Sequence, residues 1–189
     1  MADEWDERLG AARAGDEGAF RSVYRALAPS LQRYATTLAG PDGEDVASEA
    51  WLQIIRDLGA FRGGWTDFRR WAATVVRHRA LDHLRQHRRR NAYAVAPEEL
   101  AGLLDPADPA QAVVDRAGTY AALRLIATLP RDQAEAVILR VVLDFDARTT
   151  GSIMAKREGT VRVLVHRGLK ALEKRLVTVA ARSALEEVR

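Results

Sequence analysis

Hydrophobic positions recur every three or four residues along most of this chain, which is the period of an amphipathic α-helix. No segment shows the alternation of apolar and polar residues that is typical of a strand. The pattern therefore predicts an all-α fold.

The first half of the chain predicts three helices. Asp16 and Glu17 stand where a helix N-terminus favours acidic residues, and Pro29 falls inside the first helix, where we expect a kink or a break. The helices and their apolar faces are 15–38 with Phe20, Val23, Tyr24, Leu27, Leu31, Tyr34 and Leu38, 44–60 with Val46, Ala50, Trp51, Ile54, Ile55 and Leu58, and 65–90 with Phe68, Trp71, Ala72, Val75, Val76 and Leu84.

The second half predicts four helices, of which the last two are joined by a three-residue turn at 155–157. A short helix, a tight turn and a longer helix are typical of a helix-turn-helix, and Gly151 would let the two helices approach closely. The helices and their apolar faces are 120–129 with Leu123, Ile126 and Leu129, 132–143 with Val137, Ile138, Val141 and Val142, the short helix 147–154, and 158–179 with Val161, Leu164, Val165, Leu169, Leu172 and Leu176.

Residues 91–119 interrupt this pattern, because they hold three prolines, two glycines and five acidic residues. We therefore expect two small helical domains, 1–92 and 119–189, joined by a flexible acidic linker, 93–118. Two interpretations of the linker stay open: an ordinary disordered spacer, or a polyanionic strap.

Charge is segregated along the chain although the net charge is only +3. Residues 62–90 carry nine arginines and two aspartates, and a second basic block follows residue 145. Two basic blocks on separate helical modules favour two nucleic-acid contacts over merely solvated faces. Aromatic residues among the arginines suggest contact with bases as well as phosphates. Trp71, however, has the spacing of a core residue rather than of a stacking platform.

Several classes of protein are disfavoured by what the sequence lacks. It has no cysteine, no apolar run approaching the roughly 20 residues of a membrane span, and an acidic N-terminus unlike a signal peptide. His83 and His87 have a spacing that can hold zinc, but no third ligand is evident. No nucleophile elbow or phosphate-binding glycine loop is present. We expect a cytoplasmic protein that is not an enzyme and that has no metal, cofactor or membrane partner.

The chain resembles the extracytoplasmic-function (ECF) sigma factors, the two-domain sigma subunits of bacterial RNA polymerase. The stretches that carry the resemblance are residues 15–35, 43–63, 65–90, 122–146 and 156–176, and its most specific pieces are RALDHLR (79–85), LPRDQ (129–133) and EGTVR (158–162). Two places depart from the family pattern. The first helix of the helix-turn-helix reads ARTTGSIMA, with modest helix formers, and Val163 stands at a commonly polar position.

The resemblance implies promoter recognition and melting on behalf of core RNA polymerase. The first domain (region 2) would read the −10 element as a melted strand, with a loop at 62–67 that captures a flipped base. The residues expected there are Arg62, Trp65, Asp67, His78, Asp82, Arg85 and Arg89. The second domain (region 4) would read the −35 element in duplex form with Lys156, Arg157, Thr160, Arg162, Val163, His166 and Arg167.

The resemblance also implies partners. The helix over 44–60 would dock on the polymerase β′ clamp through Gln53, Arg56 and Asp57, and the second domain on the β flap. An anti-sigma factor is a further expected partner. The alternative from another class is a helix-turn-helix regulator that binds duplex operators without joining polymerase, which leaves the 44–60 and 65–90 helices without a role.

Overall fold

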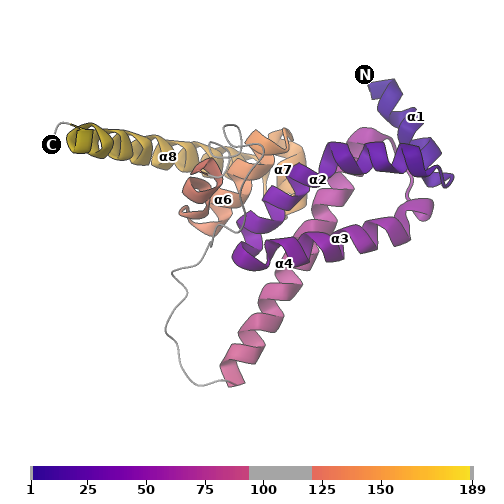
Figure 1. Cartoon of the computed structure of the whole chain (residues 1–189), viewed down its shortest axis with the longest axis horizontal. Helices are drawn as coiled ribbons and strands as arrows, with labels where there is room; N and C mark the ends of the chain where they lie inside the picture. The colour runs from indigo at the N-terminus through magenta and orange to yellow at the C-terminus, as the bar shows by residue number, and fades with distance from the viewer. Residues whose placement is uncertain (1, 94–120, 188–189) are drawn as a thin grey trace. The chain divides into compact units, whose positions relative to one another are not determined.

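The computed structural model describes residues 2–93 and 121–187, and these residues contain helices and no strand. The predicted all-α class is therefore confirmed. The chain divides into two compact units, residues 1–105 and 106–189, and each is described by itself (Figure 1). Except for Tyr93, the predicted linker, 93–118, lies outside the described residues, so its bounds stay a prediction.

Residues 2–93 of the first unit form a bundle of four α-helices. α2 packs against α1, α3 and α4, and α3 also packs against α4 (Figure 1). The elements are α1 (Ala2–Arg13), α2 (Glu17–Ala39), a 3₁₀ turn η1 (Gly40–Asp42), α3 (Gly43–Asp57), a second 3₁₀ turn η2 (Leu58–Ala60) and α4 (Trp65–Tyr93).

Two features of this unit differ from expectation. The acidic N-terminus gave no helical prediction, yet it forms α1, which is anchored by the buried Leu9 and Ala12. α2 begins where predicted, with the Asp16 carboxylate accepting from the Ala19 N–H at 2.7 Å, but it is not broken at Pro29. The helix continues because its buried face runs on through both sides of the proline, with Leu27 before it and Leu31 after it.

The buried face of α3 is narrower than predicted. Ile54 is fully buried, but Ile55 is 51% exposed, because a residue one position further along a helix points about 100° away. Trp71 and Leu84 on α4 are half-buried rather than buried. The expectation that Ile55 holds the domain together is therefore wrong.

The second unit contains the predicted helix-turn-helix. α7 (Ala147–Met154) has the predicted bounds, and α8 (Glu158–Glu187) begins at the predicted residue. Before them lie helical residues 121–127 and α6 (Arg131–Val137), which continues as a π-helical turn, η3 (Ile138–Val142). A Cβ on Gly151 would lie 2.7 Å from the Lys156 carbonyl, so this glycine lets the turn backbone approach α7.

The π-helical turn changes one part of the predicted apolar face of 132–143, in which Val137 and Ile138 are buried as predicted. A π turn follows i→i+5 hydrogen bonding, so the residues after it are displaced around the helix. Val141 is consequently 59% exposed, whereas Leu139 is fully buried. On α8, Leu169 and Leu176 are also exposed, contrary to expectation.

Candidate nucleic-acid interface

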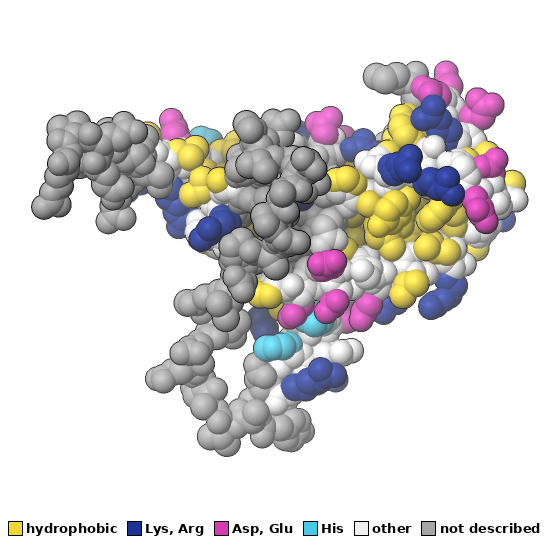
Figure 2. All heavy atoms as spheres, viewed as in Figure 1, with side chains coloured by type: hydrophobic (Ala, Val, Ile, Leu, Met, Phe, Trp, Pro, Cys, Tyr) yellow, Lys and Arg dark blue, Asp and Glu magenta, His cyan; other side chains and the backbone are white. Residues whose placement is uncertain are grey.

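One exposed face of α4 carries four of the predicted strand-binding residues. His78, Asp82, Arg85 and Arg89 are all exposed, while the opposite face is buried in the first unit. Arg85 donates to the Asp82 carboxylate at 2.8 Å, which orients its guanidinium along the helix. In Figure 2, basic and histidine side chains gather over the distal part of α4. The face presents guanidinium groups to solvent, where a phosphate chain can reach them.

A shallow cavity of about 350 Å³ lies between α3 and this part of α4. Its lining residues are Glu49, Arg79, Asp82, His83, Arg85, Gln86 and Arg89. Two contacts fix its inner wall to the preceding elements: Arg79 Nε donates to Gln53 Oε1 at 2.9 Å, and His83 Nε2 lies 2.9 Å from Asp42 Oδ2. Gln53, predicted to be an exposed polymerase contact, is thus half-buried and joins α3 to α4.

The predicted base-capturing loop is shorter than expected. Only residues 61–64 are outside helices, and Trp65 to Asp67 form the first turn of α4. Gly63 has a φ of 135°, which favours glycine. Arg62 Nη1 donates to the carbonyls of Gly59 and Phe61, at 2.9 Å each, so its side chain folds back on the loop.

The Trp65 ring is engaged by other aromatic residues. It stacks on Trp5 of α1, with ring centroids 4.6 Å apart and planes 16° from parallel. The fully buried Phe68 is a further neighbour of the Trp65 ring, with ring centroids 6.1 Å apart. The Trp5 contact was missed because no periodic pattern relates residues so far apart in the sequence. Asp67 of the same turn accepts from Arg70 at 3.1 Å.

The outward face of α8 matches the predicted recognition helix. On the opposite side of this part of α8, Val161 and Gly168 are buried. A Cβ on Gly168 would lie 2.7 Å from Val137 Cγ2 of α6. The exposed residues between and beside them are Thr160, Arg162, Val163, His166 and Arg167. This half of the helix therefore keeps its polar side exposed, because Val161 is buried and Gly168 packs closely on α6.

Ion pairs modify the predicted roles of the basic residues around α8. Arg162 pairs with Glu158 one turn earlier. Lys156 is half-buried and its ammonium lies 2.9 Å from Asp132 of α6, so it is already partnered, whereas Arg157 is exposed. A phosphate would have to compete with Asp132 for Lys156.

An open cavity of about 660 Å³ lies where the start of α7 faces α8. It brings Arg140 and Arg148 next to Arg162 and His166. Sequence reasoning missed the first two. For Arg148 the signal was available, because it lies in the first turn of the first helix of the helix-turn-helix, close to where that motif meets DNA backbone.

Asp146 caps α7 by accepting from the Thr149 N–H at 2.6 Å. The pKa of Asp146 is lowered from its ordinary value of 3.8, first by this backbone hydrogen bond and then by the Thr149 hydroxyl, with smaller contributions from Arg140 and Arg148. The ionised cap also interacts favourably with the α7 dipole. The Asp146 cap thereby stabilises α7, the first helix of the helix-turn-helix, although this helix contains modest helix formers.

Within residues 2–93 and 121–187, no group of three or more potential ligands is arranged to hold a metal ion. His83 and His87, the pair considered for zinc, have ring centroids 6.5 Å apart. No helix in the same ranges is both long and apolar enough to cross a membrane.

Comparison with known proteins assigns both units. The family model described as Sigma-70 region 2 matches residues 23–90, and that described as Sigma-70, region 4 matches residues 120–172. The ECF RNA polymerase sigma factor SigD of Mycobacterium tuberculosis is 31% identical, over 94% of this chain and 86% of SigD. BldN of Streptomyces coelicolor, also an ECF RNA polymerase sigma factor, is 28% identical over 87% of this chain, which spans 63% of BldN.

Solved structures show the same fold. The sigma factor RpoE from Bartonella quintana, in complex with the anti-sigma factor NepR, has a TM-score of 0.62 at 19% identity, covering 83% of this chain and 96% of RpoE. CnrH, in complex with the cytosolic domain of CnrY, has a TM-score of 0.61 at 14% identity, covering 92% of this chain and 97% of CnrH.

Proposed function

Because the chain belongs to the ECF sigma factors, which bind core RNA polymerase and recognise promoters, we propose that its first unit grips the melted −10 strand and its second unit reads the −35 duplex. The observation that carries the proposal is that each matched region presents one exposed cationic helix face, on α4 and on the start of α8. The protein supplies binding and strand separation to the polymerase and catalyses no reaction of its own. It works in the cytoplasm, with the polymerase.

On α4, the −10 strand would follow His78, Asp82, Arg85 and Arg89. Exposed guanidinium groups bind the backbone of single-stranded and duplex DNA alike, whereas His78 and the Asp82 carboxylate offer hydrogen bonds suited to the Watson–Crick edges that an unpaired base exposes. The neighbouring loop would receive an unstacked base, with Arg62, Trp65 and Asp67 around it. We therefore assign backbone binding to the arginines of this face, and recognition of the melted strand to His78 and Asp82.

On α8, the −35 element would be read in the major groove. Arg162 and Arg167 can each donate two hydrogen bonds to a guanine, His166 adds a further donor, and Val163 suits a thymine methyl group. Thr160, Lys156 and Arg157 stand at the N-terminal end, where phosphate contacts fix the register. Lys156 would exchange its Asp132 partner for a phosphate.

Docking on the polymerase would use the exposed side of α3. Arg56 is exposed, whereas Asp57 is half-buried. The apolar side chains beside them are more informative, because Leu52 is 64% and Ile55 51% exposed, with Tyr24 of α2 at 42%. Figure 2 shows hydrophobic side chains gathered where α2 and α3 lie side by side. We call Tyr24, Leu52 and Ile55 the apolar docking patch and propose that it faces the β′ clamp, with the second unit on the β flap. Exposed apolar groups of this kind mark protein contacts.

The regulator alternative explains α7 and α8 but gives no role to the docking patch or the arginine-rich face of α4. An anti-sigma factor is a proposed further partner, since the solved RpoE structure contains one.

Run-off transcription tests the proposal. Purified core RNA polymerase, a library of genomic fragments and the full chain should give discrete transcripts that core polymerase alone does not make. The chain should also elute with core polymerase as a stoichiometric complex on a sizing column. A chain that binds duplex fragments but neither co-elutes nor yields transcripts would be a regulator.

A further inference from the structure

Two consecutive residues of α1, Trp5 and Asp6, lie against the start of α4. The Trp5 indole stacks on the Trp65 ring at 4.6 Å. The Asp6 carboxylate accepts a hydrogen bond from the Trp65 backbone N–H at 2.5 Å. A flat aromatic ring and an adjacent anion are also the two recognisable parts of a nucleotide.

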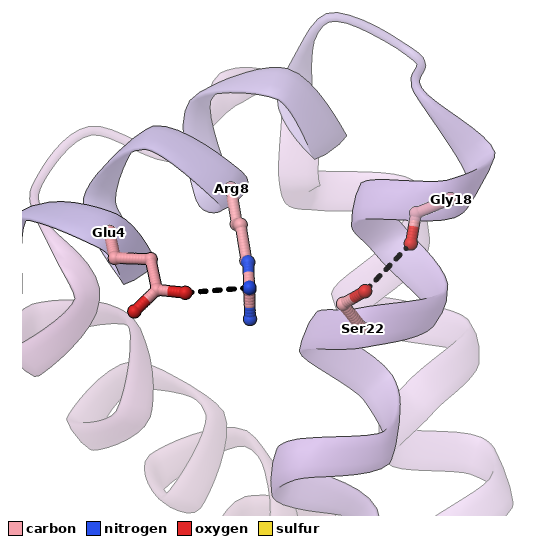
Figure 3. Close-up of polar contacts among 4 residues, drawn as sticks. All are labelled: Glu4, Arg8, Gly18 and Ser22. Carbon is pink, nitrogen blue, oxygen red and sulfur yellow. Dashed lines mark hydrogen bonds and ion pairs between the residues drawn. The ribbon is translucent and has the colours of Figure 1, made fainter. Parts of the chain in front are cut away.

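The stack blocks the route by which a base would reach Trp65. Trp5 lies parallel to the Trp65 ring to within 16°, with centroids 4.6 Å apart, so it takes a place beside this ring that a stacking base would need. Trp5 is held in turn by the Arg8 guanidinium, 4.9 Å from its ring centroid. Arg8 is fixed by an ion pair with Glu4 at 2.7 Å, and Figure 3 shows the two side chains meeting on α1.

The carboxylate occupies the place of an anion. Backbone N–H groups at a helix N-terminus attract negative charge. Here the Asp6 carboxylate accepts a hydrogen bond from the backbone N–H of Trp65. Gly64 permits the approach, because a Cβ there would lie 2.7 Å from Asp6 Oδ1. The first two turns of α1 are acidic, with Asp3, Glu4, Asp6 and Glu7. A DNA strand following α4 toward the loop would meet this repulsive charge.

We propose that Trp5 and Asp6 form an internal competitor for the −10 strand, in which the indole takes the place of an unstacked base and the carboxylate that of its phosphate. The inference rests on the proposed function, because it assumes that the loop at 61–64 and Trp65 receive that base. Binding of the strand displaces the first turn of α1, while Leu9 and Ala12 remain buried in the unit. Until displacement, the free protein binds single strands weakly.

The exchange is energetically feasible, because a stacked aromatic pair and a base stacked on an aromatic ring have stabilities of similar order. Removing the Trp5 ring should therefore strengthen strand binding by about two- to tenfold rather than by orders of magnitude. Removing only the Asp6 charge should give a smaller gain, which fades as salt screens the repulsion.

The test uses the full chain and a fluorescein-labelled single-stranded DNA of random sequence, about 12 nucleotides long, with binding followed by anisotropy. Trp5→Ala should bind about two- to tenfold more tightly than wild type. The gain should vanish in a Trp65→Ala background, because the ring that the base needs is then absent. Asp6→Asn should bind more tightly than Glu7→Gln, a matched loss of charge at the neighbouring exposed position.

Circular dichroism checks that each variant is folded, and Trp5→Leu, which keeps an apolar contact without a stacking ring, replaces Trp5→Ala if that variant unfolds. Unchanged or weaker binding of the Trp5 variants, or a gain that survives Trp65→Ala, overturns the competitor. The proposed function fails separately, if wild-type chain and core polymerase give no transcripts. If the chain supports transcription but the Trp5 variants bind single-stranded DNA no more tightly than wild type, only the competitor proposal is overturned.

Discussion

At the scale of single residues, the recognition face of α8 depends on which side chains are free to meet DNA. Arg167 is exposed, Arg162 is exposed but paired with Glu158, and Lys156 is paired with Asp132. Breaking an exposed ion pair costs at most about 1 kcal/mol, so neither pair prevents a stronger bidentate contact with a base or a phosphate. The arginines should therefore dominate readout.

Arg162→Ala and Arg167→Ala should each weaken promoter binding by about 1–3 kcal/mol and relax selectivity at −35 positions. Arg157→Ala is the matched control, because loss of a phosphate contact should weaken all sequences equally. Binding of −35 variants by the reconstituted holoenzyme measures both. Undiminished discrimination after both substitutions would remove these arginines from the readout.

Thr150 is a residue whose present identity costs stability. It is fully buried in α7, and its hydroxyl has no hydrogen-bond partner among the described residues. Thr150→Val keeps the shape and removes the unpaired hydroxyl, so we expect the free energy of unfolding to rise by about 1 kcal/mol. Urea titration measures this, with Thr149→Val as a control of opposite sign, because the Thr149 hydroxyl bonds to Asp146. A destabilised Thr150→Val would show that the hydroxyl is satisfied.

At the scale of elements, the sequence predicted what repeating patterns and local caps determine. The bounds of α7 and the start of α8 follow from the Asp146 cap and from Ala155, which ends α7 and begins the turn with a left-handed φ of 54°. The exposure of Val141 was not predictable, because a π turn has no periodic signature. The stacking of Trp5 on Trp65 joins separate helices, and only packing determines it. The outward placement of the α4 and α8 candidates was predictable from helical spacing, whereas their expected roles come from the family resemblance, and the docking patch was not predicted.

The Asp146 cap makes the stability of the second unit pH-dependent. The lowered pKa means that this carboxylate stabilises the fold above its unfolded value of about 3.8, and the contribution is lost as the pH falls through the lowered pKa. Asp146→Asn keeps a capping side chain but does not titrate. Its stability should therefore fall less than that of wild type between about pH 6 and pH 3. Chemical unfolding at each pH measures this, with Asp144→Asn as the neighbouring control; parallel curves for wild type and Asp146→Asn would contradict it.

The docking patch on α2 and α3 gives a prediction for assembly. Leu52→Glu with Ile55→Glu should reduce holoenzyme formation about tenfold or more, while the free energy of unfolding changes by less than about 0.5 kcal/mol, because both side chains are already exposed. Val141→Glu, at an equally exposed position of the second unit, is the control. Charge reversal at Arg56 and Asp57 should act in the same direction. Sizing chromatography with core polymerase decides; normal assembly would place the docking surface elsewhere.

At the scale of the whole molecule, the two units divide promoter recognition between them. In the proposed function, the second unit needs only duplex DNA, whereas the α4 face of the first needs unstacked bases. A closed duplex still offers phosphates to every arginine of α4. A change confined to His78 and Asp82 should therefore impair promoter opening without an equal loss of duplex binding. This separation distinguishes a sigma factor from a duplex-binding regulator.

The most direct measurement is permanganate reactivity of −10 thymines in complexes of core polymerase with wild type or with His78→Ala and Asp82→Ala combined. Both residues are exposed, so the variant should remain folded. We predict that it binds duplex promoter at low salt within a few fold of wild type, loses thymine reactivity, and regains transcription on a template with a pre-melted bubble. Failure of the bubble to restore transcription, or duplex binding that falls as far as opening does, would contradict the account.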